Sequence, residues 1–379
     1  MEENFTESHR LLRQMLRNFV QREIMPHINE WEEAELFPGE LYKKAAECGL
    51  LSIGFEEKYG GVESDIFHTI VVGEELSRSG SGGIVAGLGS LGIGLPPIQH
   101  LGTHEQKQRF ISPVLAGDKI AALAITEPNT GSDVASIETR AVRDGDYYIV
   151  NGSKMFITSG TRADIITTAV RTGGAGHAGV SMLVIESDSP GFHVSKKLKK
   201  MGWRCSDTAE LSFQDCRVPV ANLLGNEGDG FLAIMQNFEQ ERLSLAVMAY
   251  SSALLAWEES LNYAKQRVVF GKPLISKQVI RHKLAQMLTK VEIARDYVYS
   301  VAARMKAGQK CIREISMAKN FAVEVCDYVA NEAVQIHGGM GYMRECVVER
   351  IYRDSRILGI GGGTNEIMNE IICKTSGIG

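Results

Sequence analysis

The stretches LAITEPNTGS, Leu123–Ser132, and YYIVNGSKMFIT, Tyr147–Thr158, decide how this chain is organised. They form a strand-rich island between two long helical regions. Strand ends rich in Thr, Ser and Gly, set between apolar helices, are suited to holding a polar planar cofactor against an apolar substrate. The hydroxyl groups placed to face such a ligand are those of Thr126, Thr130, Ser132 and Thr158.

The chain before this island is predicted to be helical. Apolar residues recur at three- and four-residue spacing over residues 7–33, and Pro26 is expected to kink or split that helix. Thr103 followed by Gln106 has the pattern of a capping box and opens a helix over 103–115. Two more helices are predicted over 38–46 and 66–76.

The chain after the island is predicted to be helical again. Residues 228–266 carry one apolar face and would form a helix about 55 Å long, which needs neighbours along its length. The further helices are predicted over 277–306, 312–337 and 364–373.

Within the island, Asp144-Gly145 and Asn151-Gly152 each predict a hairpin turn. Strands are predicted to continue over 163–171, 180–186 and 208–213. The fold class is therefore mainly α with a central β domain (α+β). We expect an N-terminal helical domain over 1–120, an antiparallel sheet or small barrel over 121–225, and a C-terminal four-helix bundle over 226–379.

Composition excludes several classes of protein. A net charge of −5 gives no basic field, so nucleic acid is not an expected partner. No run of 18 apolar residues occurs, so no membrane span is expected. The seven cysteines form no CxxC pair, and no set of residues has metal-ligand spacing. The N-terminus resembles neither a signal nor a transit peptide, which predicts a cytoplasmic protein or an organellar protein whose presequence has been removed.

Three features are candidates for chemistry. Glu241 interrupts the apolar face of the long helix between Phe238 and Leu245, so it either pairs with a neighbouring helix or exchanges a proton. The run GIGGGTNE at Gly359–Glu366 is either a ligand-facing loop or a flexible turn before a capped helix. The GLGSLG run at Gly87–Gly92 matches a dinucleotide motif but follows no strand, which favours close helix packing or room for a ligand.

The sequence resembles the acyl-CoA dehydrogenase family over essentially its whole length. The motifs that carry the resemblance are EKYGG (57–61), AITEPNTGSD (124–133), VNGSKMFITSG (150–160), KKMGWRCSDTAELSFQD (199–215), QRVVFGKPL (266–274), QIHGGMGY (335–342) and GGGTNEIMNEI (361–371). The segments ERLSLA (241–246) and GGTNEI (362–367) are most similar to those of the long-chain members of the family.

The resemblance implies an FAD cofactor held by three groups of residues. The β domain would bind the flavin through Leu123, Ile125, Thr126, Gly131, Ser132, Phe156, Ile157 and Thr158. The FAD of a neighbouring subunit would be reached by Arg267, Phe270, Gln278, Gln335, Ile336, Gly338 and Gly339. The cofactor would be closed over by Thr364, Asn365 and Glu366. A shared site of this kind implies a homotetramer built from dimers.

The resemblance also implies the reaction. Many relatives carry the catalytic Glu where this chain has Gly362, whereas long-chain and isovaleryl-type relatives carry it at the position of Glu241. Glu241 would remove the α-proton of an acyl-CoA thioester and flavin N5 would accept the β-hydride, giving a trans-2-enoyl-CoA. The residues expected to contact the substrate are Ser132, Glu239, Arg242, Gly362 and Gly363.

The substrate is expected to be a long or branched acyl chain, and the electron acceptor an electron-transfer flavoprotein. Two alternatives remain. The first is an acyl-CoA oxidase-like flavoprotein that passes electrons to oxygen. The second is a non-catalytic family member that serves as a binding subunit.

Overall fold

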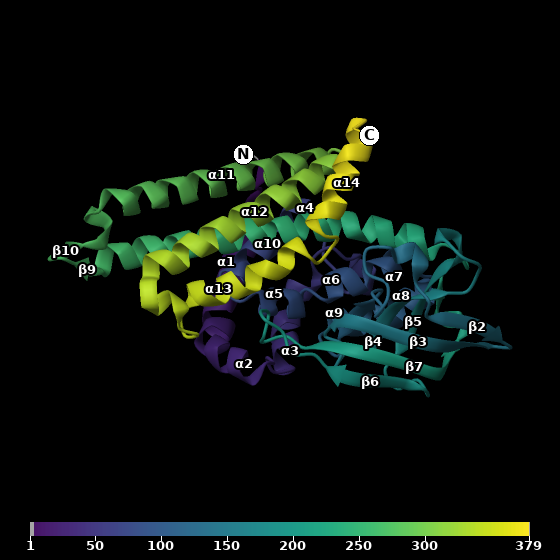
Figure 1. The fold of residues 1–379 in the computed structure, drawn as a ribbon. Coiled ribbons are helices and arrows are strands. Elements are labelled where there is room, and N and C mark those ends of the chain that lie inside the picture. Colours follow the sequence, from purple (N-terminus) through teal and green to yellow (C-terminus); the bar gives the residue numbers. More distant parts are fainter. Residues whose placement is uncertain (1–3, 379) are drawn as a thin grey trace.

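The computed structural model describes residues 4–378, with helices at both ends of the chain and a sheet between them (Figure 1). The N-terminal helices are α1 (Glu7–Phe19), α2 (Ile28–Ala34), α3 (Glu40–Glu47), α4 (Ile66–Ser77), α5 (Gly82–Leu88), α6 (Leu91–Gly94), α7 (Pro96–Leu101), α8 (His104–Phe110) and α9 (Ser112–Leu115). The predicted break at Pro26 is confirmed, because a π-turn and a 3-10 turn separate α1 from α2. The predicted capping box is confirmed as well, with the Gln106 N–H donating to Thr103 Oγ1 at 3.3 Å.

The strands are β1 (Ala121–Ala124), β2 (Arg140–Asp144), β3 (Tyr147–Thr158), β4 (Ile165–Arg171), β5 (Val180–Glu186), β6 (Phe192–Lys197), β7 (Thr208–Pro219) and β8 (Leu223–Leu224). They pair in the order β6-β7-β3-β2-β4-β5-β8, and β1 pairs with β4. The sheet is mostly antiparallel, but β1 and β2 both run parallel to β4. The expected α+β class is confirmed, but within residues 4–378 the sheet is mixed rather than antiparallel and does not form the small barrel. Parallel pairing is possible because the β2–β3 hairpin lies between β1 and β4 and provides a long crossover.

One of the two predicted hairpins is confirmed. Asp144 pairs with Tyr147 across a turn in which Gly145 has φ +59°. Asn151-Gly152 instead lies inside β3, where the register against β7 shifts by a bulge. Strand β3 has a partner on each side, so its pairing continues through this dipeptide, and a Cβ on Gly152 would lie 2.6 Å from Thr139 Oγ1.

The C-terminal region contains three long helices and two shorter ones. They are α10 (Gly230–Gln266), α11 (Gln278–Lys306), α12 (Ile312–His337), α13 (Val347–Ser355) and α14 (Asn365–Ser376). A small hairpin, β9 (Val268–Val269) and β10 (Lys272–Pro273), joins α10 to α11 at the end remote from the sheet (Figure 1). The sequence patterns predict neither α13 nor the edge strand β6. The side chains of β6 are largely exposed, so this strand has little apolar periodicity.

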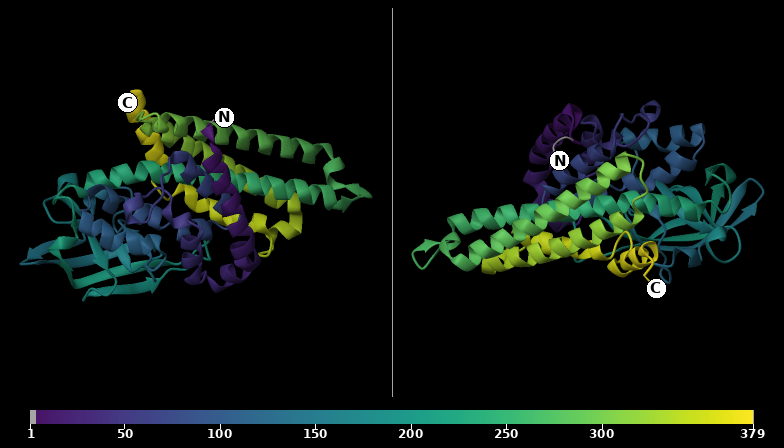
Figure 2. Two further views of the ribbon diagram at one scale, coloured as in Figure 1. Left: turned by 180° about the vertical axis from the view of Figure 1, so that it is seen from behind. Right: turned by 90° about the horizontal axis from the view of Figure 1, so that it is seen from above.

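Helix α10 joins the three regions of the molecule. It packs against α11 and α12 in the bundle and against α4 and α7 in the N-terminal region, and its first turns reach β5 (Figure 2). Within residues 4–378, no single helix combines the length and apolar character that a membrane crossing requires. The bent pair Gly82–Leu88 and Leu91–Leu101 meets those criteria jointly, but most of its residues are buried in the protein.

Candidate active site

A cavity of about 870 Å³ lies where the N-terminal helices, the β domain and α10 meet. Helices α4 to α7 and α10 contribute a mostly apolar wall. The ends of β1 and β3 contribute a second wall, and the loop between α13 and α14 contributes a third. The glycines of the GLGSLG run serve both roles expected of them. Gly89 and Gly92 line the cavity, whereas a Cβ on Gly87 would collide with the Phe37 ring at 2.4 Å.

Most site residues predicted from the sequence line this one cavity, although they come from three distant parts of the chain. They are Leu123, Ile125, Thr126, Gly131, Ser132, Phe156, Ile157, Thr158, Glu241, Arg242, Gly362, Gly363 and Thr364. The packing of the three regions therefore brings polar groups from the sheet and a carboxyl group from the bundle to the same space.

The wall from the β domain is fixed by buried polar contacts. The Met155 N–H donates to Thr126 O at 2.8 Å, which ties the end of β3 to the segment after β1. Lys154 is fully buried, and its Nζ donates to Ile125 O and to Glu127 Oε1, both at 2.8 Å. Phe156 follows at φ +62° with its side chain 66% exposed on the cavity wall. These contacts hold the backbone on either side of Phe156 and Thr126 in place.

Glu241 is the unpaired acid of the site. Its side chain lines the cavity, and its Oε2 is buried without a hydrogen-bond partner among residues 4–378. Burial raises the pKa of its carboxyl to about 7, against the opposing effect of the Lys319 and Arg242 charges. The alternative in which Glu241 simply pairs with a neighbouring helix therefore does not describe this side chain.

The glycine loop at 361–363 lies opposite Glu241. Gly362 and Gly363 have φ +63° and +92°, where glycine is favoured. A Cβ on Gly362 would lie 2.5 Å from Leu245 Cδ1 and 3.5 Å from Glu241 Oε1. The loop therefore presents backbone rather than side chains to the carboxyl group.

Two cationic side chains hold this loop. Arg242 Nε donates to Gly362 O at 3.2 Å, so Arg242 contacts the loop, and among residues 4–378 Glu241 has no ion pair within 4.0 Å. Lys319 Nζ donates to Gly361 O at 2.7 Å and to Gly363 O. Sequence reasoning missed Lys319. The available signal was the one used for Glu241, since Lys319 interrupts a buried stripe of α12 between Ser316 and Ala322.

Other predicted residues lie outside the cavity wall. The group at the far end of the bundle comprises Arg267, Phe270, Gln278, Gln335, Ile336, Gly338 and Gly339. Phe270 is 96% exposed at the tip of the small hairpin. Glu239 is half-buried beside Arg242, and Asn365 and Glu366 begin α14 without lining the cavity.

Family models match the chain in three consecutive blocks. They are the acyl-CoA dehydrogenase N-terminal domain over residues 6–118, the middle domain over 122–216 and the C-terminal domain over 228–377. The chain belongs to the acyl-CoA dehydrogenase family.

Solved structures and curated relatives agree with this assignment. A probable acyl-CoA dehydrogenase from Mycobacterium abscessus is 55% identical with a TM-score of 0.96, covering 98% of this chain and 99% of the other. The mitochondrial long-chain specific acyl-CoA dehydrogenase of Mus musculus is 41% identical over 98% of this chain and 86% of its own. An acyl-CoA dehydrogenase from Bacillus anthracis, complexed with FAD, is 34% identical with a TM-score of 0.93, covering 99% of this chain and 68% of the other.

The family assignment identifies the cofactor as FAD and the reaction as FAD-dependent dehydrogenation of an acyl-CoA. The residues present fit that cofactor. The wall from the β domain contains the exposed flat ring of Phe156 and the hydroxyl-bearing Thr126 and Thr158. The unpaired Oε2 of Glu241 lies in the same cavity.

Proposed function

We propose that the protein oxidises the Cα–Cβ bond of an acyl-CoA thioester to a trans-2-enoyl-CoA, with Glu241 as the base that removes the α-proton. The observation that carries this proposal is the unpaired Glu241 Oε2, enclosed in an apolar cavity that the flavin-binding motifs also line. A carboxyl group with a pKa of about 7 can accept a proton and release it again near neutral pH.

Glu241, Gly362 and Arg242 each have a distinct task in this mechanism. Glu241 takes the pro-R α-proton onto its carboxylate. Charge then develops on the thioester oxygen, and the Gly362 N–H donates a hydrogen bond to it. Arg242 keeps Gly362 in place through its carbonyl. The bound flavin supplies the hydride acceptor, at its N5 atom. The apolar walls exclude water, which keeps the proton transfer within the site.

The cofactor contacts are proposed residue by residue. The β wall residues Leu123, Ile125, Thr126, Gly131, Ser132, Phe156, Ile157 and Thr158 hold the flavin and pyrophosphate, and Thr364, Asn365 and Glu366 close over it. Ser132, Glu239, Gly362 and Gly363 contact the substrate. The remote group of Arg267, Phe270, Gln278, Gln335, Ile336, Gly338 and Gly339 reaches the FAD of another subunit in a homotetramer. Their position outside the cavity of their own chain supports this assignment.

We infer a long or branched acyl chain as the substrate. Gly362 brings no side chain to the cavity opposite the base, and the helical wall of the cavity is lined by apolar residues. The Mus musculus relative is named as a long-chain specific acyl-CoA dehydrogenase, which supports a long acyl chain. Turnover across straight and 3-methyl acyl-CoAs tests this inference, which is wrong if kcat/KM is highest for butyryl-CoA. Reduction of an electron-transfer flavoprotein, without oxygen uptake, supports the dehydrogenase over the oxidase.

The base assignment is tested by anaerobic mixing of Glu241→Gln with an acyl-CoA that the native enzyme oxidises. The variant should keep its FAD and its visible spectrum, and the flavin should not bleach. Glu259→Gln is the matched control, because Glu259 lies on the same helix about 27 Å further along its axis. The control should bleach at the native rate. Native bleaching by Glu241→Gln would show that the base is another group.

A further inference from the structure

Lys319 on α12 is a fully buried lysine that contacts the glycine loop opposite Glu241. A buried ammonium group is unfavourable unless its protons are bonded. Here the hydrogen bonds go to two backbone carbonyls, Gly361 O and Gly363 O, rather than to a carboxylate. Burial lowers the pKa of Lys319 to about 8, so the ammonium form still predominates at neutral pH.

The lysine completes a three-point hold on the loop. Arg242 from α10 takes the middle carbonyl, Gly362 O, so three consecutive carbonyls accept bonds from two cations on two helices. The loop has no side chains of its own between 361 and 363 with which to anchor itself. Charged hydrogen bonds are the stronger ones in proteins, so these side chains set where the Gly362 N–H lies.

The next residue of α12 extends the same hold. Asn320 Nδ2 donates to Asn365 O and to Asn369 Oδ1, both at 3.0 Å. Helix α12 therefore fixes both the glycine loop and the first turns of α14. Because Lys319 and Asn320 bind the loop to α12, the position of the loop relative to Glu241 on α10 depends on how far apart α10 and α12 lie.

Lys319 also acts on Glu241 by its charge. After burial, Lys319 has the largest effect on the pKa of Glu241 and lowers it, ahead of Arg242. Glu239 on α10 is the other charged group beside Arg242. The remaining titratable residues of the cavity wall are His100 on α7 and Asp133 after β1. The glycine loop contributes no charge to this set.

We propose that Lys319 is a positioning residue for the dehydrogenation: its ammonium fixes the 361–363 loop opposite Glu241 through its hydrogen bonds to Gly361 O and Gly363 O. This inference rests on the proposed role of Glu241. Lys319 does not touch the reacting atoms, so its effect must pass through the loop backbone and through Glu241.

The test compares Lys319→Met and Lys319→Arg with Lys200→Met in the FAD-loaded enzyme. Lys200 is a matched control. Burial lowers its pKa to about 8 as well, and its Nζ donates to Ser206 O at 2.8 Å, but it does not line the cavity. Visible absorbance and circular dichroism first establish that each variant is folded and holds flavin.

Two measurements then isolate the proposed role. Hydrogen exchange of the segment 357–367, without substrate, should be about tenfold faster in Lys319→Met, because charged hydrogen bonds to the loop are lost. The pH at which kcat is half-maximal should rise by about one unit, and kcat at pH 7 should fall by about tenfold or more. Lys319→Arg should restore part of both effects. Lys200→Met should change neither.

The outcomes separate this inference from the base assignment. If Glu241→Gln is inactive while Lys319→Met keeps the native exchange rate and the native pH profile, the role of Lys319 alone is refuted. If Glu241→Gln still bleaches, the base assignment fails and the role of Lys319 fails with it. If Lys319→Met and Lys200→Met lose activity to the same extent with unshifted pH profiles, the lysine is only structural and the inference is overturned.

Discussion

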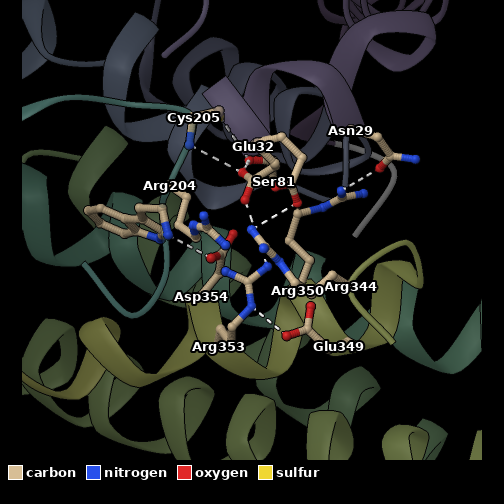
Figure 3. Close-up of polar contacts among 12 residues, drawn as sticks. Asn29, Glu32, Ser81, Arg204, Cys205, Arg344, Glu349, Arg350, Arg353 and Asp354 are labelled. Atoms are coloured by element: carbon tan, nitrogen blue, oxygen red, sulfur yellow. Dashed lines mark hydrogen bonds and ion pairs between the residues drawn. The ribbon is translucent and has the colours of Figure 1, made fainter. Parts of the chain in front are cut away.

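Two buried carboxyl groups with raised pKa values differ in what surrounds them. Glu241 lines the cavity with one oxygen unpaired. Asp354, on α13, lies at the junction of α2, α5, α13 and the segment 201–206 (Figure 3). Burial and the neighbouring Glu32 raise the pKa of Asp354, yet both of its oxygens accept backbone hydrogen bonds, from Trp203 N at 2.6 Å and Gly82 N at 2.8 Å.

The rest of the junction is paired less completely, because Glu32 Oε2 and Glu349 Oε2 are buried without a hydrogen-bond partner among residues 4–378. Glu32 Oε1 accepts from Ser81 Oγ at 2.7 Å and Cys205 N at 3.4 Å, and Arg353 Nε donates to Glu349 at 2.6 Å (Figure 3). Trp203 has φ +52°, and its bond to Asp354 helps to fix that backbone. The Asp354 cluster thus joins the N-terminal helices to the C-terminal ones.

The comparison shows that a raised pKa alone does not mark a catalytic acid or base. Burial produces the shift at both positions. What separates them is whether the carboxyl oxygens have partners and whether a cavity lies next to them. An unpaired carboxyl group beside a ligand-sized cavity can react, whereas one bonded to two backbone amides stabilises the fold.

The largest expected contrast is in rate. Glu241→Gln should lower kcat by about 10²–10⁴-fold, the usual contribution of a general base, whereas Asp354→Asn should leave kcat per bound flavin within about threefold of native. Stopped-flow reduction under anaerobic conditions, normalised to flavin content, measures both. A comparable loss of rate in the two variants would contradict the distinction.

For stability, Asp354→Asn should have the larger effect and Glu241→Gln the smaller one. Asp354→Asn leaves one buried backbone amide, of Trp203 or Gly82, without an acceptor, and should lower the free energy of unfolding by about 1–3 kcal/mol. At pH 5, Glu241→Gln removes no protein hydrogen bond from Oε2 and should leave stability nearly unchanged. Thermal and urea unfolding of the flavin-loaded proteins provide the measurement, and equal destabilisation would show that Glu241 is also structural.

The pH dependence should follow the raised pKa of Glu241. A base acts as carboxylate, so kcat should rise with pH through about 7. Stability should move in the opposite direction. The folded-state pKa lies above the ordinary 4.5, so this group's contribution is fully present below pH 4.5 and is lost as pH rises through about 7. Melting temperatures of native enzyme and Glu241→Gln from pH 5 to 8 should therefore diverge in favour of the variant.

The smallest expected effect comes from the glycine loop. Gly362→Ala places a side chain at φ +63° and against Leu245, which should cost about 1–2 kcal/mol of stability and reduce kcat by about tenfold or less. Gly361→Ala is the control, because its φ is not positive and the nearest atom to its Cβ is Ile357 O at 3.6 Å. Equal effects of the two substitutions would mean that the backbone at position 362 has no special importance.

Local sequence patterns predicted the elements well where one face is buried. The stripe over 228–266 gave α10, the Thr103 cap gave the start of α8, and Asp144-Gly145 gave the β2–β3 turn. Asn151-Gly152 misled because pairing of β3 on both sides outweighed its turn preference. The exposed edge strand β6 has almost no buried face, so its sequence carries too weak a signal for periodicity to detect.

The sequence by itself determined the three-part architecture, the family and the position of a carboxyl group on the apolar face of α10, because helical and strand periods are encoded by neighbouring residues. Only the tertiary structure decided that this carboxyl group is unpaired while Asp354 is bonded, and that Lys319 holds the loop opposite it. Those partners lie 42 to 272 residues apart along the chain. Their distances depend on how the helices and the sheet pack together, which no local pattern specifies.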